Sequence, residues 1–494
     1  MRVARRGDGG QEGTIAALMS ALSQPDEKPE TEDPGVSFRD RRHAPRLGMP
    51  MSPYGPIDTV TIEGGHALHG EVPVRGAKNS ISKQLVASLL TDEPTILHNT
   101  PAISDTFIVS EMLRAMGVHV ESEDDGAGTV SVHAEEVTPL SADRLEEFSG
   151  KSRIPILLCG PLLHRTGEAL IPGLGGDDIG GRQVNWHLMV LEQLGAQIHH
   201  EDDGLRLTTD GLVGCELRLP FPSVGATEQV LLSAVLAEGK TVLHGAAIEP
   251  EIQDLIAVLQ KMGAAIMFGA DRTIEIYGQT SLHGYEHVAI PDRLEVASWA
   301  CAAIATRGEV FIKNARVEDM VSFLGAYRLL GGRFTASPTG IHFKRAASEL
   351  HAVDLETAVH PGLMTDWQAP IGVTLTQAEG VSTIHETVYE NRFGYTDALI
   401  EMGADITVGS GCPKGKACRF GGLGHKHTAV FRGVTPLKGA DVTVPDLRAG
   451  FSHFLAALVA EGRTTVRNVR LIDRGYEGFL DKLELLGARV ISAT

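Results

Sequence analysis

Basic residues are scarce in this chain relative to acidic ones. The 494 residues include 44 lysines and arginines against 63 aspartates and glutamates, which gives a formal net charge of −19. Nonspecific binding of nucleic acid depends on a basic surface, so this composition argues against that class of function. Any site for an anionic ligand must therefore be a local cluster of basic side chains on an acidic protein.

Long hydrophobic runs are also lacking. No apolar stretch approaches the roughly 20 residues that a membrane-spanning helix needs, so we expect no membrane partner. Residues 1–56 contain few aliphatic runs and are rich in Arg, Asp, Glu, Pro and Gly. We predict that they form a disordered tail, and they lack the apolar core of a secretory signal.

Cysteine is rare and scattered. The five cysteines are an odd number, which fits free thiols in a reducing cytoplasm better than a disulfide framework. Cys412 and Cys418 lie close in sequence to His425 and His427, a combination that resembles a metal site. Their Cys-x5-Cys spacing is wider than usual for zinc, so we expect no metal and no cofactor.

The chain is long enough for at least two domains, and one pattern recurs six times in it. A helix ends in Leu or Met, a glycine follows, and a short strand begins. The glycine would stop the helix in the left-handed conformation. The six are Gly117, Gly195, Gly263, Gly331, Gly403 and Gly487.

A second recurring pattern precedes these glycines: an apolar helix, a turn and a short strand rich in β-branched residues. Clear copies are residues 86–90 before 95–97 and residues 234–239 before 241–243. Each unit therefore reads helix, strand, helix, strand, and it cannot bury both faces of its own elements. Six such units divide naturally into two domains of three.

Residues 173–182 (GLGGDDIGGR), here called the glycine loop, contain five glycines. This composition disfavours a helix or strand. The loop carries two carboxylates, Asp177 and Asp178, and one guanidinium, Arg182. These residues alone fit a lid over an anionic substrate and an ordinary surface turn equally well.

Several other polar residues lie in turns at unit boundaries. Each cation, taken singly, is better explained as a solvated charge or a helix-end ion pair. Asp366 begins an apolar helix, where it is either the N-cap or a general base. Residues 223–227 lead into a helix N-terminus that could bind an anion. The cations and their polar neighbour are Lys78, Asn79, Arg153, Arg182, Arg392, Arg448 and Arg474.

Together these motifs resemble the UDP-N-acetylglucosamine 1-carboxyvinyltransferase family of enolpyruvyl transferases, from about Ile57 to the C-terminus. The motifs are residues 76–79 (GAKN), 175–182 (GGDDIGGR), 223–227 (SVGAT), 365–366 (TD), 386–392 (ETVYENR) and 473–477 (DRGYE). The resemblance implies a two-domain α/β (α+β) fold. It is an inside-out α/β barrel of six repeated helix-strand units, three per domain. Residues 57–78 plus 292–494 would form one domain, and residues 79–291 the domain that carries the catalytic loop.

The resemblance also implies the reaction. The enolpyruvyl group of phosphoenolpyruvate would pass to the 3-hydroxyl of UDP-N-acetylglucosamine, with release of phosphate, as the first committed step of peptidoglycan synthesis. Asp177 would be the acid and Asp366 the base, with Lys78 and Arg474 also catalytic. Phosphoenolpyruvate would be held by Lys78, Arg182, Arg448 and Arg474. The nucleotide sugar would be held by Asn79, Arg153, Arg182, Gln183, Val184, Asn185, Trp186, Ser223, Val224, Gly225, Asp366 and Val388, and Arg392 completes the substrate-binding set.

The chain departs from the family pattern at four places. Asp177 replaces the usual cysteine, and a carboxylic acid can donate a proton if burial raises its pKa. A carboxylate is also the poorer nucleophile, so we expect resistance to fosfomycin, which alkylates that cysteine. Gln183, Asn185 and Trp186 replace Pro, Asp and Leu beside the uracil. Phe221 and Pro222 stand where a lysine is usual, and residues 410–426 resemble an insertion of no assigned role.

Two alternatives therefore stay open. One is an enolpyruvyl transferase that acts on another nucleotide, as Gln183 and Asn185 would allow. The other is a catalytically silent paralogue that binds UDP-N-acetylglucosamine, although the intact set of cations argues against it. The shikimate-pathway enzyme shares the fold, but the glycine loop favours the sugar enzyme.

Overall fold

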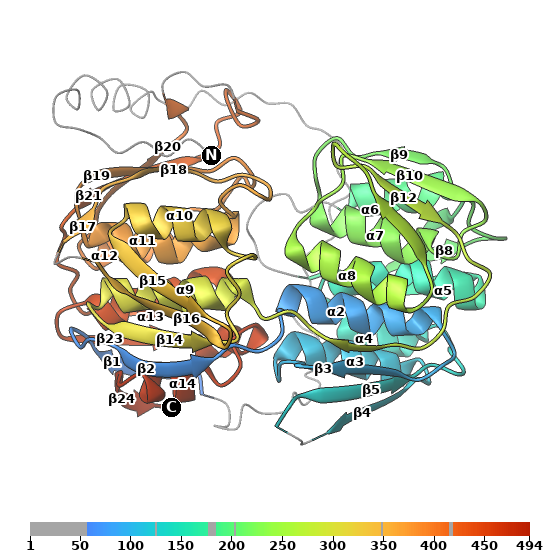
Figure 1. The fold of residues 1–494 in the computed structure, drawn as a ribbon, viewed down its shortest axis with the longest axis horizontal. Coiled ribbons are helices and arrows are strands. Elements are labelled where there is room, and N and C mark those ends of the chain that lie inside the picture. Colours follow the sequence, from blue (N-terminus) through green and yellow to red (C-terminus); the bar gives the residue numbers. More distant parts are fainter. Residues whose placement is uncertain (1–56, 124–125, 176–183, 202–203, 347–348, 414–417) are drawn as a thin grey trace.

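The computed structural model describes residues 57–494 except 124–125, 176–183, 202–203, 347–348 and 414–417. The predicted tail lies outside the described residues, as do Asp177, Asp178, Arg182 and Gln183. Figure 1 shows two bodies side by side, and β2 (His69–Pro73) lies in one while α2 (Lys78–Ala87) lies in the other. Helices and strands are mixed throughout both bodies, as the sequence predicts.

The six-glycine pattern is confirmed. All six glycines have positive φ angles, of 88°, 105°, 99°, 101°, 99° and 81° in chain order. Each follows a helix whose C-cap residue is Leu or Met, and the left-handed turn ends that helix because glycine adopts it without strain. The helices are α3 (Ser104–Ala115), α6 (Asn185–Gln193), α8 (Pro250–Lys261), α10 (Val321–Leu329), α12 (Tyr395–Glu401) and α14 (Phe479–Leu485).

An antiparallel strand pair follows each of these glycines. The pairs are β4 (His119–Glu123) with β5 (Thr129–His133), β7 (Gln197–Glu201) with β8 (Gly204–Thr208), β11 (Ala265–Phe268) with β12 (Ile274–Tyr277), β15 (Gly332–Ser337) with β16 (Gly340–Arg345), β20 (Asp405–Gly409) with β21 (Thr428–Gly433), and β24 (Arg489–Ala493) with β1 (Thr59–Glu63). The last pair joins the two ends of the described chain, so the sixth unit is completed by the first strand.

A third strand extends each pair into a small sheet. This third strand follows the apolar helix of each unit, as the sequence pattern predicts. These strands are β3 (Thr95–His98), β6 (Glu168–Pro172), β10 (Lys240–His244), β14 (Glu309–Lys313), β19 (Ala378–His385) and β23 (Arg463–Arg467). Five sheets gain parallel edge strands, which are β13 (Glu286–Val288), β9 (Glu216–Arg218), β2, β17 (Leu350–His351) with β18 (Asp354–Glu356), and β22 (Asp441–Thr443).

Two hydrophobic cores lie inside the sheets. One is built from residues 60–74 and 294–486, the other from residues 81–289. In the first, α9 (Arg293–Ala305), α11 (Gln368–Thr376) and α13 (Leu447–Val459) pack against one another. Every residue of α9 and α11 is buried, which explains why neither helix alternates polar and apolar faces. The apolar helices of the six units are α2, α5 (Cys159–Thr166), α7 (Val224–Ala234), α9, α11 and α13. The other described helices are short: α4 (Ala142–Phe148), η1 (Ser88–Leu90), η2 (Ile154–Leu158), η3 (Thr365–Trp367) and η5 (Val469–Arg474).

The chain passes between the bodies twice, and the two passages lie together. Gly76 and Pro291 form an isolated antiparallel bridge. The N–H of Ala77 donates to the carbonyl of Ile290 at 2.7 Å, and that of Asp292 donates to the carbonyl of Arg75 at 2.8 Å. A Cβ at Gly76 would lie 2.3 Å from the carbonyl oxygen of Asn99, so this close approach requires glycine. Among the described residues, none of the helices has the length and apolar composition of a bilayer crossing.

Candidate active site

A cleft of about 840 Å³ takes its lining from both bodies. Most of the predicted site residues that the structure describes line it. Val184 is instead buried beside it at the start of α6. Arg448 lies in α13, and nothing more of it is described. The predicted residues in the lining are Lys78, Asn79, Arg153, Asn185, Trp186, Ser223, Val224, Gly225, Asp366, Val388, Arg392 and Arg474.

Two cations meet at one carboxylate in the cleft, one from the passage between the bodies and one from η5. Lys78, the first residue of α2, places Nζ 2.9 Å from Oδ2 of Asp105. Arg474, the last residue of η5, places Nε 3.4 Å from Oδ1 of the same side chain. Asp105 therefore holds two predicted cations together at the place where the two bodies meet. An anionic substrate can compete with this carboxylate for both of them.

The helix that begins with Lys78 is fixed by a buried carboxylate. Asp254 of α8 accepts hydrogen bonds from the hydroxyl of Ser80 at 2.5 Å and the amide of Gln84 at 2.6 Å. Its other oxygen lies 2.8 Å from Nε2 of His287. Asp292, which caps α9, accepts from the backbone N–H of Lys78 at 3.3 Å. The position of the ammonium group thus depends on both passages between the bodies.

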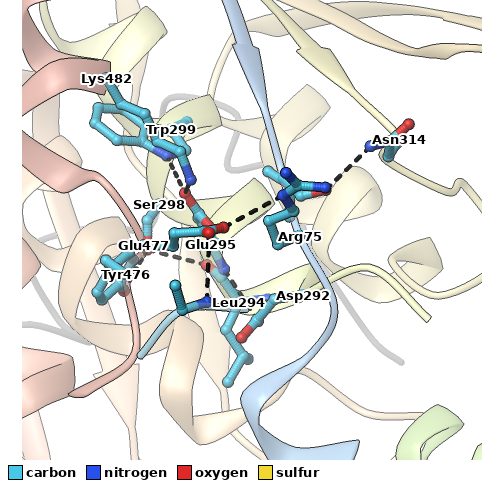
Figure 2. A network of polar contacts seen from close by, with 12 residues as sticks. Arg75, Asp292, Leu294, Glu295, Ser298, Trp299, Asn314, Tyr476, Glu477 and Lys482 are labelled. Atoms are coloured by element: carbon cyan, nitrogen blue, oxygen red, sulfur yellow. Dashed lines mark hydrogen bonds and ion pairs between the residues drawn. The ribbon is translucent and has the colours of Figure 1, made fainter. Parts of the chain in front are cut away.

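The segment that carries Arg474 is anchored on α9. Figure 2 shows this polar network, in which the hydroxyl groups of Ser298 and Tyr476 are 3.0 Å apart. Beside them, Glu477 forms an ion pair with Arg75 at 3.4 Å. Glu477 also accepts from the backbone N–H of Ala102, just ahead of α3, at 3.3 Å. The segments that carry Lys78 and Arg474 are therefore both held by residues at the passages between the bodies.

Asp366 lies in the middle of η3 and is not the N-cap of a helix. The N-cap of η3 is Met364 and that of α11 is Trp367. This corrects the structural role considered for Asp366 from the sequence. Its Oδ1 is 2.6 Å from Nη2 of Arg392, which is buried. Burial lowers the pKa of Arg392, but the carboxylates around it, Asp366 first, outweigh this and raise it.

Glu386 connects the Asp366 segment to the Val388 segment. One of its oxygens accepts from the Thr365 hydroxyl at 2.8 Å and the Gln368 amide at 2.6 Å. The other accepts from the backbone N–H groups of Val388 at 2.6 Å and Tyr389 at 3.0 Å. Burial raises the pKa of this carboxyl group. Glu386 is thus a positioning residue for two segments that line the cleft.

On the opposite wall, Ser223 caps α7, and its hydroxyl accepts from the N–H of Ala226 at 3.3 Å. Gly225 lies against the ring of His187, and a Cβ there would be 2.7 Å from Nε2. Burial, and then the charge of Arg153, lower the pKa of His187 to about 4, so this imidazole is neutral. The Ser-Val-Gly motif therefore fits a site where backbone and ring approach closely.

The sequence missed several residues that line the cleft. Asp105, in the first turn of α3, and His187, in α6, belong to no motif. Arg419 and His425 come from residues 410–426, to which the sequence assigned no role. The guanidinium of Arg419 lies 4.4 Å from the ring centroid of Phe221, which belongs to the other body. No sequence signal marked Asp105, because the fold alone brings Lys78 and Arg474 to it.

Comparisons with known proteins agree with this geometry. A sequence model of the family described as EPSP synthase (3-phosphoshikimate 1-carboxyvinyltransferase) matches residues 62–483. A protein from Protochlamydia amoebophila (strain UWE25), named UDP-N-acetylglucosamine 1-carboxyvinyltransferase, is 46% identical over 440 residues, which is 88% of this chain and 94% of that protein. One of the same name from Chlamydia abortus (strain DSM 27085 / S26/3) is 46% identical over 436 residues, 87% of this chain and 97% of that protein.

A solved structure extends the agreement to the fold. The enolpyruvyl transferase NikO from Streptomyces tendae matches with a TM-score of 0.77 at 26% identity. The match covers 89% of this chain and 100% of that chain, so it includes both bodies and the cleft between them. The chain therefore belongs to the enolpyruvyl transferases and, within them, to the UDP-N-acetylglucosamine 1-carboxyvinyltransferase family.

Proposed function

We propose that this enzyme transfers the enolpyruvyl group of phosphoenolpyruvate to the 3-hydroxyl of UDP-N-acetylglucosamine and releases phosphate, in the cytoplasm. The observation that carries the proposal is the meeting of Lys78 and Arg474 at one carboxylate, in the cleft that also holds Asp366. The two relatives at 46% identity bear the name of this activity. We propose no role for nucleic acid, and no metal in the chemical step.

The first step of the reaction is an addition. The 3-hydroxyl oxygen attacks carbon 2 of phosphoenolpyruvate while Asp366 accepts the hydroxyl proton and Asp177 gives a proton to carbon 3. Arg392 holds Oδ1 of Asp366 and so orients the base. Lys78 and Arg474 stabilise the phosphate and carboxylate of the substrate, together with Arg182 and Arg448.

The second step is an elimination. Carbon 3 loses a proton, the bond between carbon 2 and the phosphate oxygen breaks, and phosphate leaves with its electron pair. The enol ether of the product is thereby formed. The positive side chains that held the phosphate group stabilise the leaving group.

We propose that the two bodies are the two domains of an inside-out α/β barrel enzyme, residues 57–78 plus 292–494 and residues 79–291. Cations from both sides would then meet the substrate when the cleft closes. The paired passages at residues 75–77 and 290–292 support this division, because few other backbone hydrogen bonds need to change when the bodies move.

The test is release of phosphate from phosphoenolpyruvate with and without UDP-N-acetylglucosamine. We expect release to depend on the acceptor. Arg474→Ala should lower kcat at least about 100-fold, since it removes stabilisation of the transition state. Arg470→Ala is the matched control, because Arg470 lies in the same helix η5 and is 65% exposed. Phosphate release that ignores the acceptor, in folded protein, would contradict the proposal.

A second candidate is an enolpyruvyl transferase for another nucleotide. The ring of Trp186 lies 6.4 Å from that of Phe221, on which Arg419 rests, at the place where a lysine is usual in the family. A panel of UDP, TDP, GDP and ADP sugars separates the candidates. A higher kcat/KM with any sugar nucleotide other than UDP-N-acetylglucosamine would favour the second. Saturable binding without turnover would indicate the silent paralogue instead.

A further inference from the structure

Four side chains with metal-binding atoms gather at one end of the β19–β21–β20 sheet. His385 ends β19, His427 directly precedes β21, and Cys412 and Cys418 lie between β20 and β21. Their ligand atoms all lie within 4.8 Å of one another. Both histidines are buried and both cysteines are half-buried. None of the four lines the cleft.

The distances between the ligand atoms lie close to the edges of one coordination tetrahedron. The two sulfur atoms are 3.3 Å apart, and Nε2 of His427 is 3.4 Å from each of them. Zinc bonds of about 2.3 Å to sulfur and about 2.0–2.1 Å to nitrogen give tetrahedral edges of about 3.8 Å between sulfurs and about 3.6 Å between sulfur and nitrogen, so the ligand atoms need to move apart by at most about 0.5 Å. A disulfide would need a sulfur separation of about 2.05 Å, and both cysteines are free thiols.

Hydrogen bonds select the tautomer that zinc requires at both histidines. Nδ1 of His427 lies 2.6 Å from the carbonyl oxygen of His425, which can only accept, so Nδ1 carries the proton. Nδ1 of His385 lies 2.9 Å from the hydroxyl of Thr428. That hydroxyl donates its own proton to the carbonyl of Gly411 at 2.7 Å, so it accepts from His385. In both rings Nε2 therefore keeps its lone pair for a metal.

We propose that Cys412, Cys418, His385 and His427 bind one zinc ion. Two thiolates and two neutral imidazoles at tetrahedral spacing form a closed structural zinc site. Binding releases the two thiol protons, and the two thiolates balance the charge of the ion. This is the opposite of the sequence expectation, which considered His425 and His427 beside the two cysteines and rejected a metal because of the Cys-x5-Cys spacing. The fold supplies His385 from a distant strand.

The ion would fix the segment that reaches across the cleft. Arg419 directly follows the ligand Cys418, and it pairs with Glu390 at 3.5 Å and rests on Phe221 of the other body. The ring of Phe420 packs at 5.7 Å against that of the ligand His427. The site thereby positions a cation beside the proposed acceptor site. This consequence rests on the proposed function, whereas the metal site does not.

The metal site is tested on the full-length protein, purified with reductant and without added metal. Elemental analysis should find one zinc per chain, and cobalt exchanged into the wild-type protein should give the absorption of a tetrahedral site with thiolate ligands. Cys418→Ser should lose the metal, while Cys215→Ser, which changes a half-buried free thiol elsewhere, should keep it.

Two outcomes would overturn the metal site. One is a reduced wild-type protein that holds no zinc and gives no thiolate band with cobalt. The other is a Cys412–Cys418 disulfide found by mass spectrometry in protein purified without reductant. Because the cobalt spectrum is taken on the wild-type chain, the test does not depend on whether the cysteine variants fold.

The positioning role has its own test. Arg419→Ala should keep its zinc and raise the KM for UDP-N-acetylglucosamine about fivefold, with the KM for phosphoenolpyruvate unchanged, because it removes one cation–aromatic contact. Arg432→Ala, which removes an arginine paired with Asp405 on the same sheet, should change neither KM. An unchanged acceptor KM in Arg419→Ala would refute this role and leave the zinc result standing. A failure of the proposed function would show separately, as no acceptor-dependent phosphate release by the wild-type protein.

Discussion

At the scale of single residues, the cleft is organised by carboxylates with different neighbours. Asp366 is held by Arg392, Asp105 is shared by Lys78 and Arg474, and buried Glu386 accepts hydrogen bonds from two lining segments. The same functional group thus serves as bridge and as support, and at Asp366 as the proposed base. What distinguishes the three is the set of donors around each, which the fold provides.

The aspartate at position 177 leads to a prediction at this scale. Asp177→Cys should keep acceptor-dependent activity and gain time-dependent inactivation by fosfomycin, because a thiolate is a far better nucleophile than a carboxylate. The measurement is residual activity against incubation time, followed by peptide mass analysis. Asp178→Cys is the control and should remain resistant. Inactivation of the wild-type enzyme with a covalent adduct on Asp177 would refute the prediction.

Residue roles were the part of the site that the sequence alone could not supply. No periodicity links Lys78 to Arg474, and only the family motifs bring them together. Asp105 lay outside every motif because its role arises from the meeting of two bodies. The proposed zinc ligands show the same limit. A helix and a strand separate His385 from Cys412 in the sequence, and only the folded sheet places the two side chains together.

At the scale of elements, the sequence was more informative. A glycine after an apolar helix end is a local signal, since the left-handed turn depends on that residue, and all six glycines adopt it. Sheet pairing is less local. The pairing of β24 with β1 joins the two ends of the described chain, and the interval between the repeated glycines could not have revealed it.

The α7 N-terminus gives a prediction at this scale. Gly225→Ala would place a Cβ 2.7 Å from Nε2 of His187, so the ring or the helix must shift. Overpacking of this kind costs about 1–3 kcal/mol. We expect lower stability in urea unfolding and weaker binding of UDP-N-acetylglucosamine in calorimetry.

Gly269→Ala is the matched control for Gly225→Ala. A Cβ at Gly269 would meet nothing closer than 3.5 Å. It should leave both stability and binding close to those of the wild type. Equal effects of the two substitutions would show that the approach of His187 to α7 does not constrain this site.

At the scale of the whole molecule, buried charges lie where the two bodies meet. Arg293 of α9 binds both oxygens of Glu251 of α8 at 2.9 Å, and both side chains are buried. Glu228 of α7 lies nearby, 3.5 Å from Lys83 of α2. Removing one partner of such a pair costs about 3–5 kcal/mol, because the other charge stays buried and unpaired. Stability therefore depends on the charge state of the buried carboxyl groups in this region.

Glu228 makes this dependence of stability on charge measurable. Burial raises its pKa to about 7, with the charges of Glu251 and Glu249 adding to the effect and that of Lys83 opposing it. In the unfolded chain a glutamate has a pKa of about 4.3. Below that pH both states hold the proton. As the pH rises toward 7, only the unfolded state releases it, so stability falls across this window and levels off above pH 7.

The loss between pH 4.5 and pH 8 should amount to about 3 kcal/mol for this group. Glu228→Gln does not titrate, so its free energy of unfolding should lack this decline. The measurement is urea unfolding of both proteins at several pH values, because the difference between them cancels all other titrating groups. Glu216→Gln, at a side chain that is 70% exposed, is the control and should follow the wild type. A difference between wild type and Glu228→Gln that does not change with pH would mean that Glu228 is ionised in the folded protein, and that Lys83 outweighs its burial.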